Sequence, residues 1–131
     1  MKFTEILKKI DESIGRCYFV VAFDLESGLP ISGFSRQYQD SLESITAANK
    51  QMIDIVLKGQ QQARLPVIRA ALKNFKELIL ETSKSTFVIL LPRPDKKIAV
   101  AVGVPKDVQL GWVKYSIQRH YDELVDALQE L

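Results

Sequence analysis

The chain has 131 residues, 47% of them hydrophobic, and its 18 basic and 16 acidic side chains leave a formal net charge of +2. We expect one domain over residues 1–131, with an N-terminal helix at 1–15 and a core at 16–131. The two charge signs are interleaved, which argues against a nucleic-acid-binding surface. The chain has no apolar run near the roughly 20 residues that span a bilayer, and its first residues lack the apolar middle of a secretory signal. We therefore expect a cytoplasmic protein without membrane insertion.

The first part of the chain predicts a short amphipathic helix followed by a β-hairpin. Apolar residues recur at helical spacing before Gly15, at Phe3, Ile6, Leu7, Ile10 and Ile14. The run from Tyr18 to Asp24 is apolar on both faces, which is typical of a strand inside a layered sheet. Glu26-Ser27-Gly28 supplies a turn before a more mixed strand at residues 29–35.

A long helix is predicted at residues 40–62, where proline is absent and Gly59 is the single glycine. Its apolar side chains cover an arc of about 200° on a helical wheel, more than one sheet face needs. The surplus edge includes Ala48, Met52 and Ile55. Either another helix of the same chain covers this edge, or a second copy does. We favour self-association, because a two-fold interface buries one patch against its own copy.

The rest of the chain predicts three strands and a helix. The strands lie at residues 75–82, 86–91 and 98–102, with a turn at 92–95, and a single helix is expected from about 107 to 130. The strands at 18–24, 86–91 and 98–102 are apolar on both faces and should be interior. Pro30 and Gly33 suit an edge strand, and so do the charges Lys76, Glu77 and Glu81. The fold class is therefore α/β, an α+β sandwich, with a five-stranded mixed or antiparallel sheet in the order 2-1-5-4-3 and helices on both faces.

The sequence has no recognisable catalytic, cofactor-binding or metal site. It lacks a phosphate-binding Gly-x-x-x-x-Gly-Lys-Ser/Thr loop and a Gly-x-Gly-x-x-Gly motif after a strand. His120 falls on the inner side of the last helix, which favours a packed neutral imidazole over a catalyst. Cys17 begins a buried strand and is interpreted as a small hydrophobe. Asp24 and Glu26 are interpreted as a strand end and a turn. We expect no catalytic residues, no cofactor and no metal.

One candidate partner-binding surface lies on the last helix. Trp112, Tyr115 and Arg119 share a stripe outside the core-facing positions of that helix. Aromatic residues with arginine are the usual composition of interface hot spots. The alternative is that Trp112 only covers the edge of the sheet.

Two segments resemble the roadblock/dynein light-chain family. These are the hairpin Val20-Val-Ala-Phe-Asp24-Leu-Glu-Ser-Gly28-Leu-Pro-Ile-Ser32 and the helix entry Val108-Gln-Leu-Gly111-Trp-Val-Lys-Tyr-Ser-Ile117, in the right order around the long helix. Gln109 stands where that family often has asparagine. The resemblance implies a roadblock/profilin-like fold and a dimer, with itself or with a paralogue, whose long helices pair and whose third strands meet. It adds Lys76, Leu78 and Leu80 to the expected interface.

The resemblance also implies a non-enzymatic regulator or scaffold that binds a Ras-like small GTPase. Some bacterial members stimulate GTP hydrolysis by their partner without donating an arginine, so no catalytic role is expected for Arg64, Arg69 or Arg119. The alternative functions are a small-molecule-sensing domain and a purely structural homodimeric adaptor. A weaker alternative is an enzyme that uses Cys17.

Overall fold

A computed structural model describes residues 2–73, 75–93 and 95–131. Pro94, in the predicted turn at 92–95, lies outside the described residues. Five antiparallel strands form one sheet in the order β2-β1-β5-β4-β3. The strands are β1 (Phe19–Asp24), β2 (Pro30–Phe34), β3 (Glu77–Glu81), β4 (Ser85–Leu90) and β5 (Ile98–Pro105). The predicted order is confirmed, and every pairing is antiparallel.

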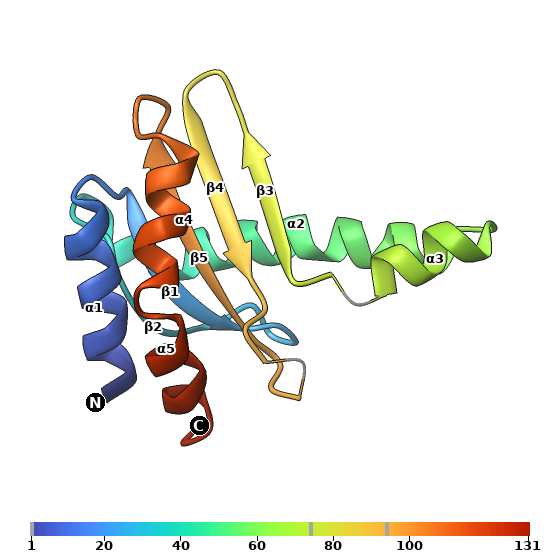
Figure 1. Cartoon of the computed structure of the whole chain (residues 1–131), viewed down its shortest axis with the longest axis horizontal. Helices are drawn as coiled ribbons and strands as arrows, with labels where there is room; N and C mark the ends of the chain where they lie inside the picture. Colours follow the sequence, from blue (N-terminus) through green and yellow to red (C-terminus); the bar gives the residue numbers. More distant parts are fainter. Residues whose placement is uncertain (1, 74, 94) are drawn as a thin grey trace.

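Helices cover both faces of this sheet (Figure 1). On one face lie α1 (Lys2–Ile14), α4 (Leu110–Gln118) and α5 (Tyr121–Leu128). On the other face lies α2 (Leu42–Gln62), which follows a 3₁₀ turn at Gln39–Ser41. Beyond α2 comes α3 (Pro66–Lys73), and Figure 1 shows that the end of α2 and all of α3 extend past the β3 edge.

The interior strands carry apolar side chains on both faces because each face has its own core. Val20, Val88 and Val100 belong to the cluster under α1, α4 and α5. Val21, Ile89 and Ala101 belong to the cluster under α2. Alternation along each strand sends successive side chains to opposite faces, so a strand covered on both sides needs a continuous apolar run.

Helix α1 ends where the sequence predicts. Its five apolar residues are all buried, and Gly15 has a φ of 89°, a left-handed conformation that glycine adopts without strain. The Gly15 amide donates to the carbonyl oxygen of Asp11 at 2.9 Å. Nη1 of Arg36 donates to the carbonyl oxygen of Gly15 at 2.9 Å. Arg36, which is distant from α1 in the sequence, thus caps the C-terminal end of this helix.

The turn between β1 and β2 is built by the residues expected for it. Oδ1 of Asp24 accepts a hydrogen bond from the amide of Glu26 at 2.7 Å. Gly28 has a φ of 75°, which closes the turn. Asp24 and Glu26 are therefore a strand end and a turn, as predicted.

Two elements differ from the predictions. The expected single helix at 107–130 is two helices, because His120 leaves the helical region with φ −117° and ψ 9°. Its amide donates to the carbonyl oxygen of Ile117, three residues back, which tightens the turn before α5 begins. The second difference is α3, which falls in a segment for which no element was predicted.

Candidate interaction surfaces

The predicted α2 edge contains both exposed and partly buried side chains. Ala48 is exposed, and the side chain of Ile55 is 71% exposed. Met52 is half-buried and packs against the core beneath α2. Of the three α2 residues expected at an interface, Ala48 and Ile55 are therefore accessible, whereas Met52 also supports the fold.

The β3 edge of the sheet has an outward-facing set of backbone groups. The amide of Leu91 donates to the carbonyl oxygen of Lys76 at 2.9 Å, and that of Thr82 donates to the carbonyl oxygen of Ser85 at 2.8 Å. Hydrogen bonding alternates along an antiparallel pair, so the odd-numbered residues 77, 79 and 81 turn their N–H and C=O groups away from β4. These groups are available to another strand.

The side chains of β3 give this edge an apolar flank on the α2 side. Leu78 is half-buried against the α2 cluster, and Leu80, two residues further on, is 40% exposed. Lys76, just before the strand, is exposed. The exposed side chain of Leu80 and the exposed side chain of Ile55 thus belong to the same face of the molecule.

Helix α3 adds an apolar surface that the sequence reasoning missed. Leu65, Val67 and Ile68 are exposed, while Leu72 lies close to Gly59 of α2. The signal was present in the sequence, because Pro66 is a favourable first helical residue and Val67-Ile-Arg-Ala-Ala-Leu72 contains no further breaker.

Trp112 and Tyr115 lie on α4, and Arg119 directly follows its last residue, so the three residues of the predicted stripe lie along one line. The rings of Trp112 and Tyr115 have centroids 5.7 Å apart, and the Arg119 guanidinium lies 5.8 Å from the centre of the Tyr115 ring. Trp112 is 45% exposed and Tyr115 is 55% exposed. The indole nitrogen of Trp112 donates to the carbonyl oxygen of Ile14 at 3.2 Å, so this side chain also anchors α1.

The other two arginines considered for catalysis lie near the end of α2. Arg64 is exposed. Nη2 of Arg69 donates to the carbonyl oxygen of Ala63 at 2.9 Å, just beyond the last turn of α2. This contact is one that a cationic side chain commonly makes at a helix C-terminus.

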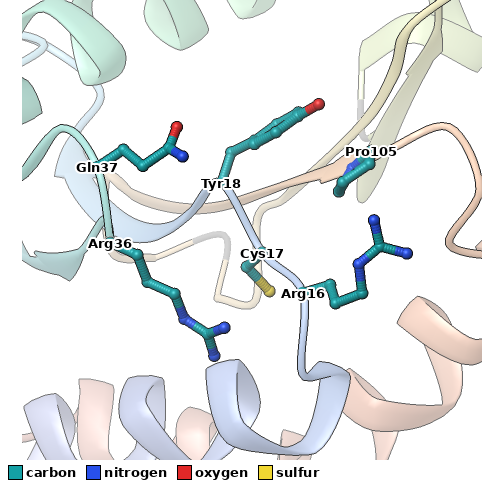
Figure 2. Close-up of a pocket in the computed structure, with 6 residues that line it drawn as sticks. All are labelled: Arg16, Cys17, Tyr18, Arg36, Gln37 and Pro105. Atoms are coloured by element: carbon teal, nitrogen blue, oxygen red, sulfur yellow. The ribbon is translucent and has the colours of Figure 1, made fainter.

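Cys17 lies in a hollow of about 210 Å³ between the side chains of Arg16 and Arg36 (Figure 2). Burial raises the pKa of its thiol from 9.0 to about 12, and the nearby Asp11 carboxylate contributes to this rise. Both arginines have acidic partners, Asp107 for Arg16 and Asp11 for Arg36. A hydrogen bond from Arg16 lowers the pKa of Asp107 below its ordinary value. The thiol is therefore protonated at neutral pH, which argues against a nucleophile.

A second hollow of about 180 Å³ lies between β3 and α4. Its floor is apolar and includes Val88, Leu90 and Ile117, and an ion pair between Lys114 and Glu77, with a nitrogen to oxygen distance of 3.2 Å, lies at its rim. This volume is below the roughly 300–1,000 Å³ of typical ligand sites.

His120 is partly buried, as expected for a packing role, with its Nδ1 3.8 Å from a carboxylate oxygen of Glu123. Across residues 2–73, 75–93 and 95–131, no three His, Cys, Asp or Glu side chains come together as a metal site would require. None of the helices in the same ranges has the length and hydropathy needed to span a membrane.

Comparison with known proteins places this architecture in a structural class. No protein-family model matches the sequence, and no curated protein sequence does. Among solved structures, Myxococcus xanthus MglB is 14% identical with a TM-score of 0.75, over 100% of this chain and 98% of that one. The Roadblock/LC7 domain from Streptomyces avermitilis is 10% identical with a TM-score of 0.76, over 96% and 97%. The gliding protein MglB from Thermus thermophilus is 13% identical with a TM-score of 0.76, over 99% and 90%.

These likenesses span nearly the whole of each chain, and the sheet order is the one already described. The protein has the roadblock fold. Sequence identities of 10–14% support a shared fold but do not establish a shared function.

Proposed function

We propose that the protein is a dimeric, non-enzymatic regulator or scaffold that binds a Ras-like small GTPase. The observation that carries the proposal is the likeness to two MglB structures over nearly their full length. The exposed apolar surface on α2 and the open edge of β3 support the dimeric part of it. A self-complementary patch next to an unpaired strand edge is the arrangement that a two-fold interface uses.

In the proposed dimer, β3 pairs with the same strand of a second copy. Only the odd-numbered residues of β3 turn their backbone groups outward, so odd residues must pair with odd ones. A two-fold axis at Ile79 meets this condition. It brings Leu78 opposite the partner subunit's Leu80, an apolar cross-strand pair on the α2 face. Ala48 and Ile55 are exposed on α2, the helix that covers this face of the sheet.

The stripe on α4 is the proposed contact for a further partner, because the α2 and β3 surfaces are used by the dimer. Tyr115 and Arg119 are exposed and already held against each other, so little side-chain freedom is lost when a partner binds. In this proposal any stimulation of GTP hydrolysis arises from ordering the partner's own switch segments.

Two measurements test the proposal. Sedimentation at micromolar concentration should give twice the mass of the chain, and a folded monomer there would contradict the dimer. Affinity capture with the purified chain, against small GTPases loaded with GDP or a GTP analogue, should retain one in a saturable complex. Failure of a dimer to bind any of them would leave the structural adaptor as the better interpretation.

A further inference from the structure

A third hollow, of about 340 Å³, opens at the start of α4 and shares no lining residue with the Cys17 hollow. It is lined by Glu81 at the end of β3, by Thr82 and Thr86, and by Lys106, Val108, Gln109 and Leu110. The side chains around it include hydrogen-bond donors on several sides, and of its lining the proposed dimer uses only the backbone of Glu81.

The first set of donors is the N-terminus of α4. The amides of Trp112 and Val113 both donate to the carbonyl oxygen of Gln109, at 3.0 and 3.2 Å. In the part of the chain that the structure describes, the amides of Leu110 and Gly111 have no acceptor. The Gln109 side chain makes no capping hydrogen bond. The helix therefore begins with uncapped N–H groups, which carry its positive partial charge.

The second donor is the hydroxyl of Thr86. Thr86 is only 5% exposed, yet within the described residues its hydroxyl makes no hydrogen bond, and its side chain lines the hollow. The Thr86 hydroxyl oxygen is not fully enclosed, so part of the small exposed area of this residue is polar. A polar group this deep usually has a partner.

The charge around the hollow has two signs. Lys106 is exposed and, in the described part of the chain, forms no ion pair. Glu81 carries the opposite charge at the outer wall, and it is exposed, so its carboxylate is screened by water. The helix terminus, the Thr86 hydroxyl and the Lys106 ammonium are all donors, and together they favour an anion.

We propose that this hollow binds the phosphate group, either as inorganic phosphate or as a phosphate monoester. The backbone amides at the start of α4 bind one edge of the anion, Thr86 donates from the sheet, and Lys106 supplies the countercharge. A tetrahedral dianion accepts from several directions at once, whereas a planar carboxylate offers two oxygens.

The test is a titration followed by the backbone amide signals of the full chain in NMR, at constant ionic strength. Inorganic phosphate and O-phosphoserine should each shift Leu110 and Gly111 saturably, whereas acetate and chloride should not. Tighter binding of phosphoserine identifies a phosphorylated partner as the source, and tighter binding of phosphate identifies the free anion. Shifts that do not saturate, or that chloride reproduces, would overturn the site.

Variants separate this site from a general effect of charge. Thr86→Val keeps the shape and removes the hydroxyl, and Lys106→Gln removes the charge, so each should weaken binding at least fivefold. Glu81→Gln should strengthen it. Lys8→Gln removes the same charge from an exposed position on α1 and should leave binding unchanged. Equal affinity in wild type, Thr86→Val and Lys106→Gln would contradict the proposal.

One variant distinguishes loss of phosphate binding from loss of folding. Gln109→Asp places a carboxylate where it can accept from the first amides of α4. It should abolish phosphate binding while raising the thermal midpoint of unfolding. Retained binding with a raised midpoint would show that the helix terminus is not part of the site. The outcomes for Thr86→Val, Lys106→Gln and Gln109→Asp depend neither on dimerisation nor on a GTPase, whereas Glu81 also belongs to the proposed β3 contact.

Discussion

The indole nitrogen of Trp112 donates a hydrogen bond to the carbonyl oxygen of Ile14 at 3.2 Å, which joins the start of α4 to the end of α1. Tyr115 lies one turn further along the same stripe and is more exposed, with no such anchor among the described residues. The two aromatic residues of the stripe therefore have different roles, although the sequence presents them alike.

Trp112→Phe should lower the free energy of unfolding by about 1 kcal/mol, the usual contribution of one hydrogen bond. Tyr115→Ala should change it by less than about 0.5 kcal/mol, because the ring is exposed. Urea denaturation checks both values. If the stripe binds a partner, Tyr115→Ala should still weaken that binding, and a variant that binds normally would remove Tyr115 from the contact.

Ile55→Glu should convert the proposed dimer to a folded monomer. The side chain is 71% exposed in the isolated chain, so the charge costs the monomer little, whereas burying it at an interface should raise the dissociation constant roughly 100-fold or more. Analytical ultracentrifugation measures the change. Leu29→Glu is the matched control, because Leu29 is 56% exposed beside β2, at the opposite edge of the sheet. Equal dimerisation of both variants would exclude Ile55 from the interface.

Glu81→Pro should weaken the dimer without unfolding the chain. The amide of Glu81 points to the open edge, so its removal leaves the β3–β4 ladder intact and takes away one inter-subunit donor. Glu81→Ala controls for loss of the charge. Comparison of circular dichroism and sedimentation for the two variants distinguishes an edge effect from misfolding, and a proline variant that dimerises as well as the alanine variant would argue against strand pairing.

Cys17 should make stability depend on pH under alkaline conditions. The unfolded thiol loses its proton near pH 9.0, but burial raises the pKa of the folded thiol to about 12. Above pH 9 the unfolded state therefore binds fewer protons than the folded state, and stability falls as the pH rises, by at most about 1.4 kcal/mol per pH unit. Cys17→Ala should lack this component. Urea denaturation of both proteins from pH 8 to 10.5 checks it, and parallel curves would contradict it.

Arg64→Ala, Arg69→Ala and Arg119→Ala should each reduce stimulation of a bound GTPase only as far as they weaken binding. A donated arginine accelerates hydrolysis by roughly 10³- to 10⁵-fold, so losing it would abolish activation at saturation. Single-turnover GTP hydrolysis at saturating dimer separates the two cases. If one variant binds normally and loses nearly all stimulation, that arginine takes part in the transition state.

Much of the fold follows from the sequence, because the residue types along a strand indicate which of its two faces are buried. Apart from Asp24 and Thr86 at their ends, the runs at 18–24, 86–91 and 98–102 are apolar on both faces, and only interior strands covered on both sides require this. The five apolar positions of α1 and the turn at Gly28 depend likewise on local spacing and backbone conformation. Such features involve residues close together in the chain, and a sequence pattern can express them.

The remaining features depend on contacts between distant residues, and only the tertiary structure decided them. His120 breaks the last helix in a segment without proline or glycine, where the sequence has no breaker. The contact of Trp112 with Ile14 joins residues nearly a hundred positions apart, and the hollow at Thr86 exists because β3, β4 and the start of α4 meet there. Whether a polar group finds a partner depends on the geometry of all its neighbours, which no local pattern of residue types contains.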